Sequence, residues 1–586
     1  MKNAINFLLC FCLPAVFFSC TQKSISIHDF GVNENTIDVT PYVVAVLEKC
    51  RKTGATELVF DKGTYHFYPD KGVDKYCFVS NNDEGFKRVI FNLEGFKQLT
   101  INGNGSEFIF HGFVNPFVVD NSSQITFKNF SIDFNRPFHS EGIILANNPD
   151  GVDLEIPENF PFKIQNRLLL FTGGRPQEGR RTTVSREVIY TYGSLLEFDT
   201  EKRETAFMAR DYYINNIPLV AESIGERKVR VFLPGLKGTV GNTIVFGAGH
   251  RNYPGFILSD SKDILFDNVI IYHCGGMGII GQRVHNVTID SCKVIPSEGR
   301  IVSATADATH FTNCTGKIVL SNCVFMNQKD DATNIHGIYV QISEIINPNE
   351  VIVKLKHGQQ LGFDFLKKGT PVEFVHGKSL ITKGTAKVLE AKRINKELTC
   401  VKLSTDLPDG ITVGDAIGED ADFAEVHIHG NYIGKNRARG MLLNCRGKTV
   451  VENNVFHSPG AAILFEGDAN YWFEQGGVRD CIIRNNIFDN CLFGVWGQAV
   501  IDVGAGIVEN KEESRYNRNI KVYDNTFRIF DDVFLLQAYG MKDLVWKDNK
   551  VERTSDYPAR RTNTTFFKVE YCDNMNIEQD GLVLNF

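Results

Sequence analysis

The chain has 586 residues, of which 43% are hydrophobic and 23% charged, and its formal net charge is −7. This is the composition of a globular protein with an ample core. No excess of basic residues supplies the positive field that nucleic-acid binding requires, so we expect no nucleic-acid partner.

The first segment, residues 1–20, is interpreted as a targeting sequence. A short basic start precedes the apolar stretch from Ile5 to Phe18, which is too short to span a bilayer as a mature helix. It ends at Ser19-Cys20, and a Cys after a small residue at this place resembles a bacterial lipoprotein signal. We therefore expect export, lipidation of Cys20, and anchoring in the periplasm or outer membrane of a Gram-negative bacterium. An ordinary secretory signal cut near Ser19 is the alternative.

Residues 21–149 are expected to form an N-terminal cap and the first coils of a repeat. The amphipathic run Val43–Cys50 predicts a short helix, and Leu58–Phe60 predicts a strand after it. A helix at this place covers the open end of a stack of strands, which would otherwise present unpaired edges. This order resembles the N-terminal cap of pectin-degrading β-helix enzymes.

A recurring unit of alternating apolar and polar residues around an Asn follows the cap, as in Ile125–Ile132. Alternation with a period of two residues predicts strands, and Asn tolerates a left-handed bend and can form a ladder from coil to coil. Repeats of roughly 20 to 30 residues indicate a solenoid. We therefore predict an all-β fold, a right-handed parallel β-helix. The Asn place is occupied by Asn129, Asn268, Asn454, Asn486, Asn525 and Asn549, and by Cys292 and Cys323.

Two stretches, 150–250 and 338–422, carry strand patterns but lack the Asn unit. We interpret both as small β-barrel insertions that loop out of the solenoid, which is tolerated because a long insertion adds little loop entropy. The central coils are then expected at 251–337 and the C-terminal coils at 423–586. Since the second insertion begins just after an Asp pair, we expect it to wall a cleft there.

Cysteine usage gives no metal pattern. The chain has 14 Cys, and their spacings include no CxxC pair and no zinc motif. We expect buried free thiols at Cys274, Cys292, Cys314 and Cys323, with a bridge open in an exported protein.

The spacing of three aspartates along the chain indicates a chemical function. The step from Asp307 to the pair Asp330-Asp331 is about one coil of such a solenoid, so the carboxylates are expected on neighbouring coils of one wall. Clustered carboxylates are what acid/base cleavage of a glycosidic bond requires. A solvated turn is the alternative interpretation of the Asp pair taken alone.

The three Asp positions resemble the active site of polygalacturonase-like β-helix hydrolases. The closer resemblance, over nearly the whole mature chain, is to the exo-acting α-1,3-galactosidases of glycoside hydrolase family 110. It implies cleavage of terminal α-1,3-linked galactose with inversion, without a metal or another cofactor, from an oligosaccharide or glycan such as a blood group B-type or linear Galα1-3Gal chain. By this resemblance Asp307 is the general acid, and Asp330 and Asp331 activate water. Retention and an exchange of roles among the three stay open.

Further residues are expected to bind substrate. His310 and His336 lie near the aspartates in sequence, and Arg437 and Arg439 are expected one coil beyond them. A later block resembles another family block, in which an aromatic ring stacks on galactose and carboxylates accept its hydroxyl groups. This block contributes Glu466, Asp468, Trp472 and Glu474.

Two other functions stay open as alternatives to α-1,3-galactosidase activity. A polygalacturonase-like hydrolase would add a Gly-His-Gly and an Arg-x-Lys at matching places, and neither is found there. A non-catalytic glycan-binding solenoid predicts that the three Asp side chains do not converge. The sequence leaves open the choice between fucosylated and linear substrates, and a homodimer.

Overall fold

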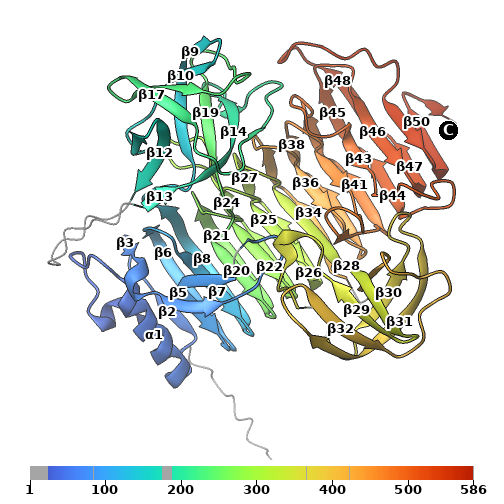
Figure 1. The fold of residues 1–586 in the computed structure, drawn as a ribbon, viewed down its shortest axis with the longest axis horizontal. Coiled ribbons are helices and arrows are strands. Elements are labelled where there is room, and N and C mark those ends of the chain that lie inside the picture. The colour runs from blue at the N-terminus through green and yellow to red at the C-terminus, as the bar shows by residue number, and fades with distance from the viewer. Residues whose placement is uncertain (1–23, 84, 174–187, 365, 421–422, 585–586) are drawn as a thin grey trace, which may run out of the picture.

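The computed structural model describes residues 24–83, 85–173, 188–364, 366–420 and 423–584. The predicted signal and Cys20 lie outside the described residues. Figure 1 shows parallel strands stacked from the N-terminal end, where α1 (Thr40–Thr53) lies, to the C-terminal end, with two additional domains on the side of the stack. Among the described residues, no helix has both the length and the apolar character needed to cross a membrane.

The stack is a parallel β-helix whose coils place strands on three faces. This confirms the predicted all-β fold. The first face contains β2 (Glu57–Val59), β6 (Leu99–Phe110), β8 (Ser123–Phe134), β21 (Lys262–Ile271), β23 (His285–Asp290), β26 (Thr315–Ser321), β34 (Glu425–His429), β37 (Thr449–Glu452), β41 (Cys481–Arg484), β44 (Asn517–Tyr523), β47 (Met541–Lys547) and β50 (Asp573–Gln579). The second face contains β3 (Thr64–Phe67), the second halves of β6, β8 and β21, and β24 (Lys293–Val294), β27 (Val324–Met326), β35 (Tyr432–Gly434), β38 (Val455–His457), β42 (Ile487–Asp489), β45 (Thr526–Ile529) and β48 (Lys550–Arg553).

The third face positions the site described below. Its strands are β5 (Phe86–Glu94), β7 (Asn115–Asp120), β20 (Phe256–Ser259), β22 (Ile279–Gln282), β25 (Thr309–Thr312), β28 (Thr333–Asn347), β36 (Met441–Leu443), β39 (Ile463–Phe465), β43 (Ala499–Val503), β46 (Phe534–Tyr539) and β49 (Phe567–Glu570). Apolar side chains from all three faces fill the interior of the coils. In the N-terminal coils this core is aromatic: Phe91, Phe117 and Phe256 stack with ring centroids 4.3 and 4.5 Å apart.

At the bend between the first and second faces, two neighbouring residues fill the two roles expected of the Asn. One adopts the left-handed backbone conformation, and the next forms the ladder. In the C-terminal coils, Asn453 and Asn485 adopt the left-handed backbone conformation. The residue after each of them turns inward, so that Asn454 Nδ2 donates to Asn486 Oδ1 at 3.0 Å. This buried ladder runs through Asn431, Asn454, Asn486, Asn525 and Asn549.

Cysteines continue the ladder toward the N-terminus, as the sequence predicts. The backbone N–H of Cys323 donates to Asn431 Oδ1 at 2.8 Å, and the Cys323 Sγ contacts the Ile289 carbonyl oxygen one coil earlier. Cys274, Cys292, Cys314 and Cys323 are all buried, and none of the described cysteines is bridged. The expectation of buried free thiols is thus confirmed.

The cap is built as expected from an amphipathic helix. In α1, Val43, Val46, Leu47 and Cys50 are buried against the first coils, and Gly54 ends the helix in the left-handed conformation. Before it, β1 (Ser24–Ser26) pairs with β2, and η1 (Ile27–Phe30) lies between β1 and α1.

The first insertion forms one antiparallel sheet of 11 strands, which begins ahead of residue 150. It contains β9 (Ser140–Asn148), β10 (Gly151–Glu155), β11 (Phe162–Gln165), β12 (Leu168–Gly173), β13 (Val188–Tyr190), β14 (Tyr192–Asp199), β15 (Glu204–Thr205), β16 (Tyr212–Tyr213), β17 (Val220–Gly225), β18 (Lys228–Phe232) and β19 (Thr243–Ala248).

The second insertion closes into a barrel in the order β28, β29, β32, β31, β30 and β33, around its own apolar core. Strand β28 starts in the third face of the β-helix and continues into the barrel without a break. The remaining barrel strands are β29 (Glu350–Lys354), β30 (Pro371–Val375), β31 (Thr382–Arg393), β32 (Leu398–Leu403) and β33 (Ala416–Glu419).

Candidate active site

The three aspartates precede consecutive strands of the third face. Thr309 of β25 is in register with Thr333 of β28, and Thr333 is in register with Met441 of β36. Continuing this register, Asp331 lies directly beside Asp307, because the Ala308 N–H donates to the Asp331 carbonyl oxygen at 2.9 Å. Arg439 follows on the next coil, and Asp330 is displaced by one residue from this column.

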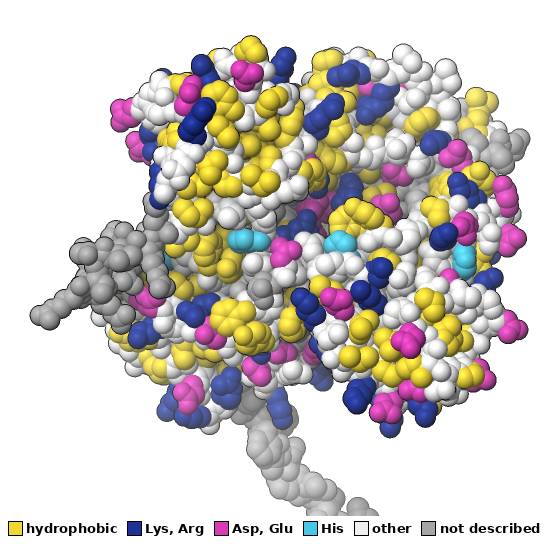
Figure 2. All heavy atoms as spheres, in the orientation of Figure 1, with side chains coloured by type: hydrophobic (Ala, Val, Ile, Leu, Met, Phe, Trp, Pro, Cys, Tyr) yellow, Lys and Arg dark blue, Asp and Glu magenta, His cyan; other side chains and the backbone are white. Residues whose placement is uncertain are grey.

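The aspartate side chains converge as the catalytic prediction requires. One oxygen of each of Asp307, Asp330 and Asp331 lies within 4.8 Å of the others, and all three residues are buried. This contradicts the rival function of a binding solenoid, which predicted side chains that point apart. Their cavity has a volume of about 190 Å³. Figure 2 shows a hollow on this face between the two insertions, with acidic and basic side chains at its floor.

Asp330 is held by arginines from two sides. Arg251 donates to its Oδ2 at 2.8 Å, and Arg437 donates to its Oδ1 at 3.0 Å. Burial alone would raise the pKa of Asp330, but the charges of Arg437, Arg251 and Arg439 hold it at about 2. Asp330 is therefore ionised at neutral pH.

Asp331 is paired with one arginine. Arg439 donates from Nε and from its terminal nitrogen to the two oxygens of Asp331, at 2.9 and 3.0 Å. Burial raises the pKa of Asp331 to about 7, against the charge of Arg439 and with the added repulsion of Asp330 and Asp307. The carboxylate next to Asp307 thus titrates near neutrality.

Asp307 is the protonated member of the cluster. Burial and the charge of Asp330 raise its pKa to about 8, although Arg251 and Arg439 oppose this. Like charges packed at this distance drive one carboxyl group to keep its proton. The cluster therefore combines a neutral acid with an ionised partner at neutral pH, the pairing that acid/base hydrolysis needs.

Two histidines fix the position of that proton. His336 Nδ1 lies 2.6 Å from the Gly337 carbonyl oxygen, which only accepts, so Nδ1 carries hydrogen and the His336 Nε2 of a neutral ring accepts. The Nε2 atoms of His310 and His336 are 2.9 Å apart, so His310 donates there. His310 Nδ1 is then an acceptor, because burial lowers the pKa of His310 to about 4. In the contact between His310 Nδ1 and Asp307 Oδ2, the hydrogen is therefore carried by Asp307.

The four residues predicted from the later block lie at this cavity in different roles. Glu474 accepts from Asn81 Nδ2 at 3.0 Å and lies 3.6 Å from His336 Nε2. Burial raises the pKa of Glu466. Asp468 accepts from the backbone N–H groups of Tyr471 and Trp472 at 2.6 and 3.0 Å, so it shapes the loop that carries Trp472. Trp472 lines the rim of the cavity with 42% of its surface exposed.

The sequence interpretation missed residues that come from the insertions. Arg251 follows the last strand of the first insertion, and no local motif marks it as a partner of Asp330. Asp211 and Tyr213, from the same insertion, bind Arg437 at 2.8 and 3.0 Å. From the second insertion, Gln359 of η3 (Gly358–Gln360) also lines the cavity. Both insertions thus wall the site.

A cation could bridge three carboxylate oxygens at this spacing. Three guanidinium groups, of Arg251, Arg437 and Arg439, already lie against the same carboxylates. The negative charge of the cluster is therefore balanced by the protein itself.

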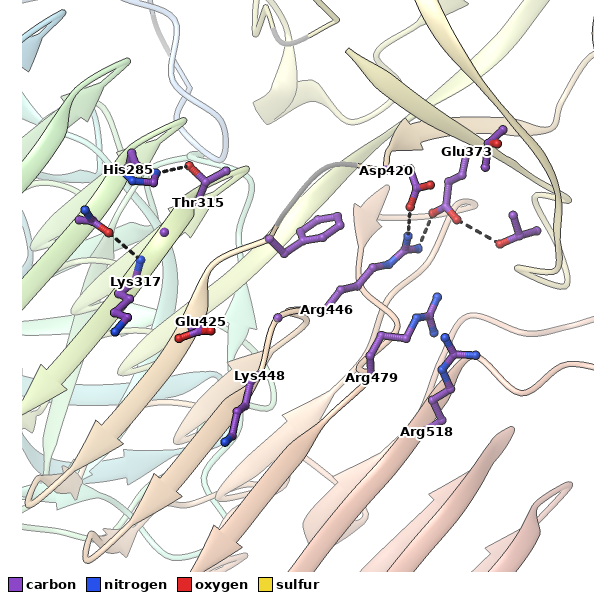
Figure 3. A pocket seen from close by; sticks show the side chains of 16 residues that line it. His285, Thr315, Lys317, Glu373, Asp420, Glu425, Arg446, Lys448, Arg479 and Arg518 are labelled. Carbon is purple, nitrogen blue, oxygen red and sulfur yellow. Dashed lines mark hydrogen bonds and ion pairs between the residues drawn. The ribbon is translucent and has the colours of Figure 1, made fainter. Parts of the chain in front are cut away.

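A larger cavity, of about 1210 Å³, lies between the first face and the second barrel. Figure 3 shows Arg479 and Arg518 reaching into it beside Arg446, which is paired with Glu373 and Asp420. Its carboxylates are separated by arginine and lysine side chains and do not form a catalytic cluster (Figure 3).

Comparison with known proteins agrees with this arrangement. Family models described as GLAA-B beta-barrel domain I and GLAA-B beta-barrel domain II match residues 140–243 and 350–417. The chain is 37% identical to Alpha-1,3-galactosidase A of Shewanella woodyi, over 94% of this chain and 90% of that protein. It is 30% identical to Alpha-1,3-galactosidase B of Bacteroides thetaiotaomicron, over 99% and 94%.

Among solved structures, a Family 28 exopolygalacturonase of Yersinia enterocolitica is similar at 10% identity with a TM-score of 0.36, over 96% of this chain and 79% of that one. This likeness is too distant to bear on activity. The near full-length identity to the curated relatives, together with both barrel matches, shows that the chain belongs to the α-1,3-galactosidase family.

Proposed function

We propose that this protein is an exo-acting glycoside hydrolase that removes terminal α-1,3-linked galactose from glycans by single-displacement inversion. Family membership supports the substrate, and the proton arrangement around Asp307 carries the mechanism. The small cavity supports an exo mode, because it admits a chain end rather than the middle of a polysaccharide.

In this mechanism the O–H of Asp307 turns from His310 Nδ1 to the glycosidic oxygen and protonates it as the bond to the leaving group breaks. One water attacks the anomeric carbon from the other side and transfers a proton to the Asp330–Asp331 pair. A water that donates to two carboxylate oxygens at about 2.8 Å each spans about 4.4 Å between them. The oxygens of Asp330 and Asp331 lie within 4.8 Å of each other, which is compatible with such a bridge.

The arginines support inversion over retention. A retaining enzyme uses one carboxylate as a nucleophile that forms a covalent bond to the sugar. Asp330 is ion-paired through both oxygens, and so is Asp331, which weakens either carboxylate as a nucleophile but leaves each oxygen a lone pair for water.

The distance between the carboxylates favours retention instead. Inverting pairs usually stand about 6.5–9.5 Å apart and retaining pairs about 5–5.5 Å apart. The close approach within 4.8 Å is nearer to the second range. Retention is therefore the second candidate, with the same substrate.

Proton NMR of the purified protein with Galα1-3Gal and its fucosylated form decides between inversion and retention. β-Galactose as the first product is the expected result, since it requires both the activity and inversion. α-Galactose first would keep the activity and assign one Asp as a nucleophile. Release from neither substrate would overturn the proposed function.

We also propose that the protein is exported and anchored through a lipid on Cys20. The apolar segment before Ser19-Cys20 supports this. Labelling with a radioactive fatty acid in a bacterial host should mark the wild type and not Cys20→Ser. Equal labelling of both, or of neither, would contradict the anchor.

A further inference from the structure

The cavity of about 1210 Å³ between the first face and the second barrel carries an excess of positive charge. Among the described residues that line it, three carboxylates face five cationic side chains: Glu373, Asp420 and Glu425 against Lys317, Arg446, Lys448, Arg479 and Arg518. The whole chain has a net charge of −7, so this local excess is opposite in sign to the rest of the molecule. A positive cavity on an acidic protein indicates an anionic ligand.

One of the arginines and two of the carboxylates neutralise one another. Glu373 accepts a hydrogen bond from Arg446, and Asp420 lies 3.7 Å from the same guanidinium group. The third carboxylate, of Glu425, lies on β34 in register with Lys317 of β26. The negative charges of the cavity thus lie beside Arg446 and the lysines.

Arg479 and Arg518 are the two cations that lack a counterion. Among the described residues neither forms an ion pair, and the Arg479 side chain donates only to the Tyr516 carbonyl oxygen, at 2.9 Å. The two arginines lie on neighbouring coils, because the Arg518 N–H donates to the Val478 carbonyl oxygen at 2.9 Å. Burial, and then the charges of Arg446 and Arg518, lower the pKa of Arg479. An anion between the two guanidinium groups would offset their repulsion.

Both side chains are open to the cavity. Arg518 is exposed and Arg479 is half-buried, and Figure 3 shows both extending into the cavity side by side. A guanidinium group has five N–H donors in a planar fork that matches the oxygen atoms of an oxyanion. Since Arg479 uses a single donor within the protein, the pair keeps the donors that such a group needs.

The rest of the wall suits a sugar better than a lipid or a peptide. Phe423 is the one apolar side chain among the described lining residues, and Arg446 lies over its ring at 5.4 Å. Hydroxyl and amide groups continue the wall, from Asn286, Thr315, Thr382 and Thr385. The volume is that of a ligand with several rings and is far larger than an inorganic ion.

We propose that this cavity is a second glycan-binding site, in which Arg479 and Arg518 hold the sulfate or carboxylate group of an anionic sugar. It is separate from the catalytic site, because the two cavities share no lining residue among those that the structure describes. The inference goes beyond the proposed function and rests on it only in taking a glycan as the ligand.

Isothermal titration calorimetry of the purified protein with three monosaccharides tests the site. N-Acetylglucosamine 6-sulfate carries a sulfate group, N-acetylneuraminic acid carries a carboxylate, and N-acetylglucosamine carries neither. At least one of the two anionic sugars should bind tenfold or more tightly than the neutral one, and the tighter of the two identifies the anionic group. Equal Kd values for all three sugars, or binding of none, would overturn the proposal.

Variants of the exposed arginine locate the binding. Arg518→Gln should raise Kd for the anionic sugar tenfold or more, and Arg518→Lys, which keeps the charge, should raise it by a smaller factor. The matched control is Arg528→Gln, which removes the same charge from an exposed arginine of β45 on the second face and should leave Kd unchanged. An unchanged Kd in Arg518→Gln, or an equal rise in Arg528→Gln, would overturn the assignment.

Two further measurements separate this site from a simple ion site and from the catalytic cavity. Inorganic sulfate that binds as tightly as the sulfated sugar would overturn the glycan as ligand. The rate of Galα1-3Gal hydrolysis should stay within twofold in Arg518→Gln and in saturating anionic sugar, whereas competitive inhibition would place that sugar in the catalytic cavity and overturn the proposal. A wild-type protein that hydrolyses no galactoside but binds the anionic sugar through Arg518 would overturn the proposed function and leave the second site in place.

Discussion

His310 Nδ1 lies 2.6 Å from Asp307 Oδ2, at the end of a chain of contacts that starts at the Gly337 carbonyl oxygen. Because the carbonyl can only accept, the direction of each hydrogen bond in the chain is set. Asp307 holds the hydrogen of the last contact, and His310 is placed to share it. The position of the catalytic proton is thus determined by a backbone atom two side chains away.

The first prediction concerns the acid. Asp307→Asn should lower kcat/KM for Galα1-3Gal by about 1,000-fold, because an amide cannot protonate the leaving group. The loss should be much smaller with α-galactosyl fluoride, whose leaving group needs no proton. Steady-state kinetics with both substrates measures this.

Asp330→Asn and Asp331→Asn provide the contrast in that experiment. Both should abolish turnover of either substrate while the far-ultraviolet circular dichroism spectrum stays that of the wild type. Near-wild-type rates in either variant would show that the residue does not activate water. An Asp307→Asn enzyme equally impaired with the fluoride would remove Asp307 from the acid role.

The second prediction concerns pH. Activity should fall as pH rises through about 8, where Asp307 loses its proton. The charge of Glu474 contributes to raising the pKa of Asp307, so Glu474→Gln should move this alkaline limb to lower pH. The pH dependence of kcat/KM between pH 5 and 10 tests this. An alkaline limb that stays in place or moves upward would mean that another group titrates there.

The third prediction concerns the rim. Trp472 offers an exposed ring to the apolar face of a sugar, and His357 packs beside it at 4.7 Å between ring centroids. Trp472→Ala should raise KM about 3- to 10-fold, the equivalent of about 0.5–1.5 kcal/mol of ring contact. The adjacent Tyr471 is 71% exposed and does not line the cavity, so Tyr471→Ala is the control. Equal KM values for the two variants would assign Trp472 a structural role.

The fourth prediction concerns stability. Asn486 donates to the Val451 carbonyl oxygen and to Asn525 Oδ1, both at 3.0 Å, and accepts from Asn454. Asn486→Ala leaves these buried partners unsatisfied and should lower the free energy of unfolding by about 2–4 kcal/mol. Denaturant unfolding measures the change against Asn35→Ala, at an exposed position. A difference below about 0.5 kcal/mol would show that the ladder adds little to stability.

The sequence predicts those parts of the molecule that repeat along the chain. Strand alternation and the Asn unit indicate the solenoid, and the short distance between Asp307 and Asp330-Asp331 indicates a shared wall. Arg437 and Arg439 follow because they belong to the next coil. The register itself is not predicted: coils differ in length by a few residues, so the sequence cannot distinguish Asp330 from Asp331 as the neighbour of Asp307.

The parts that escaped prediction depend on contacts between distant segments. Arg251 reaches Asp330 because the first insertion returns the chain there, and Asp211 reaches Arg437 from within that insertion. Lys329 lies beside the Asp pair, but only the folded chain shows that its ammonium has no hydrogen-bond partner among the described residues. Such features arise from how a domain docks onto the coils, which leaves no periodic pattern.

Strand β28 passes from the catalytic coil directly into the second barrel. Thr333 lies two residues after Asp331, and the same strand pairs with β33 and β29 farther along. Because one strand belongs to both parts, we expect a tilt of the barrel against the β-helix to displace the aspartates just before it. Among relatives, changes of substrate preference should therefore accumulate in the loops of the barrel, such as 355–364, while its orientation on the β-helix stays the same.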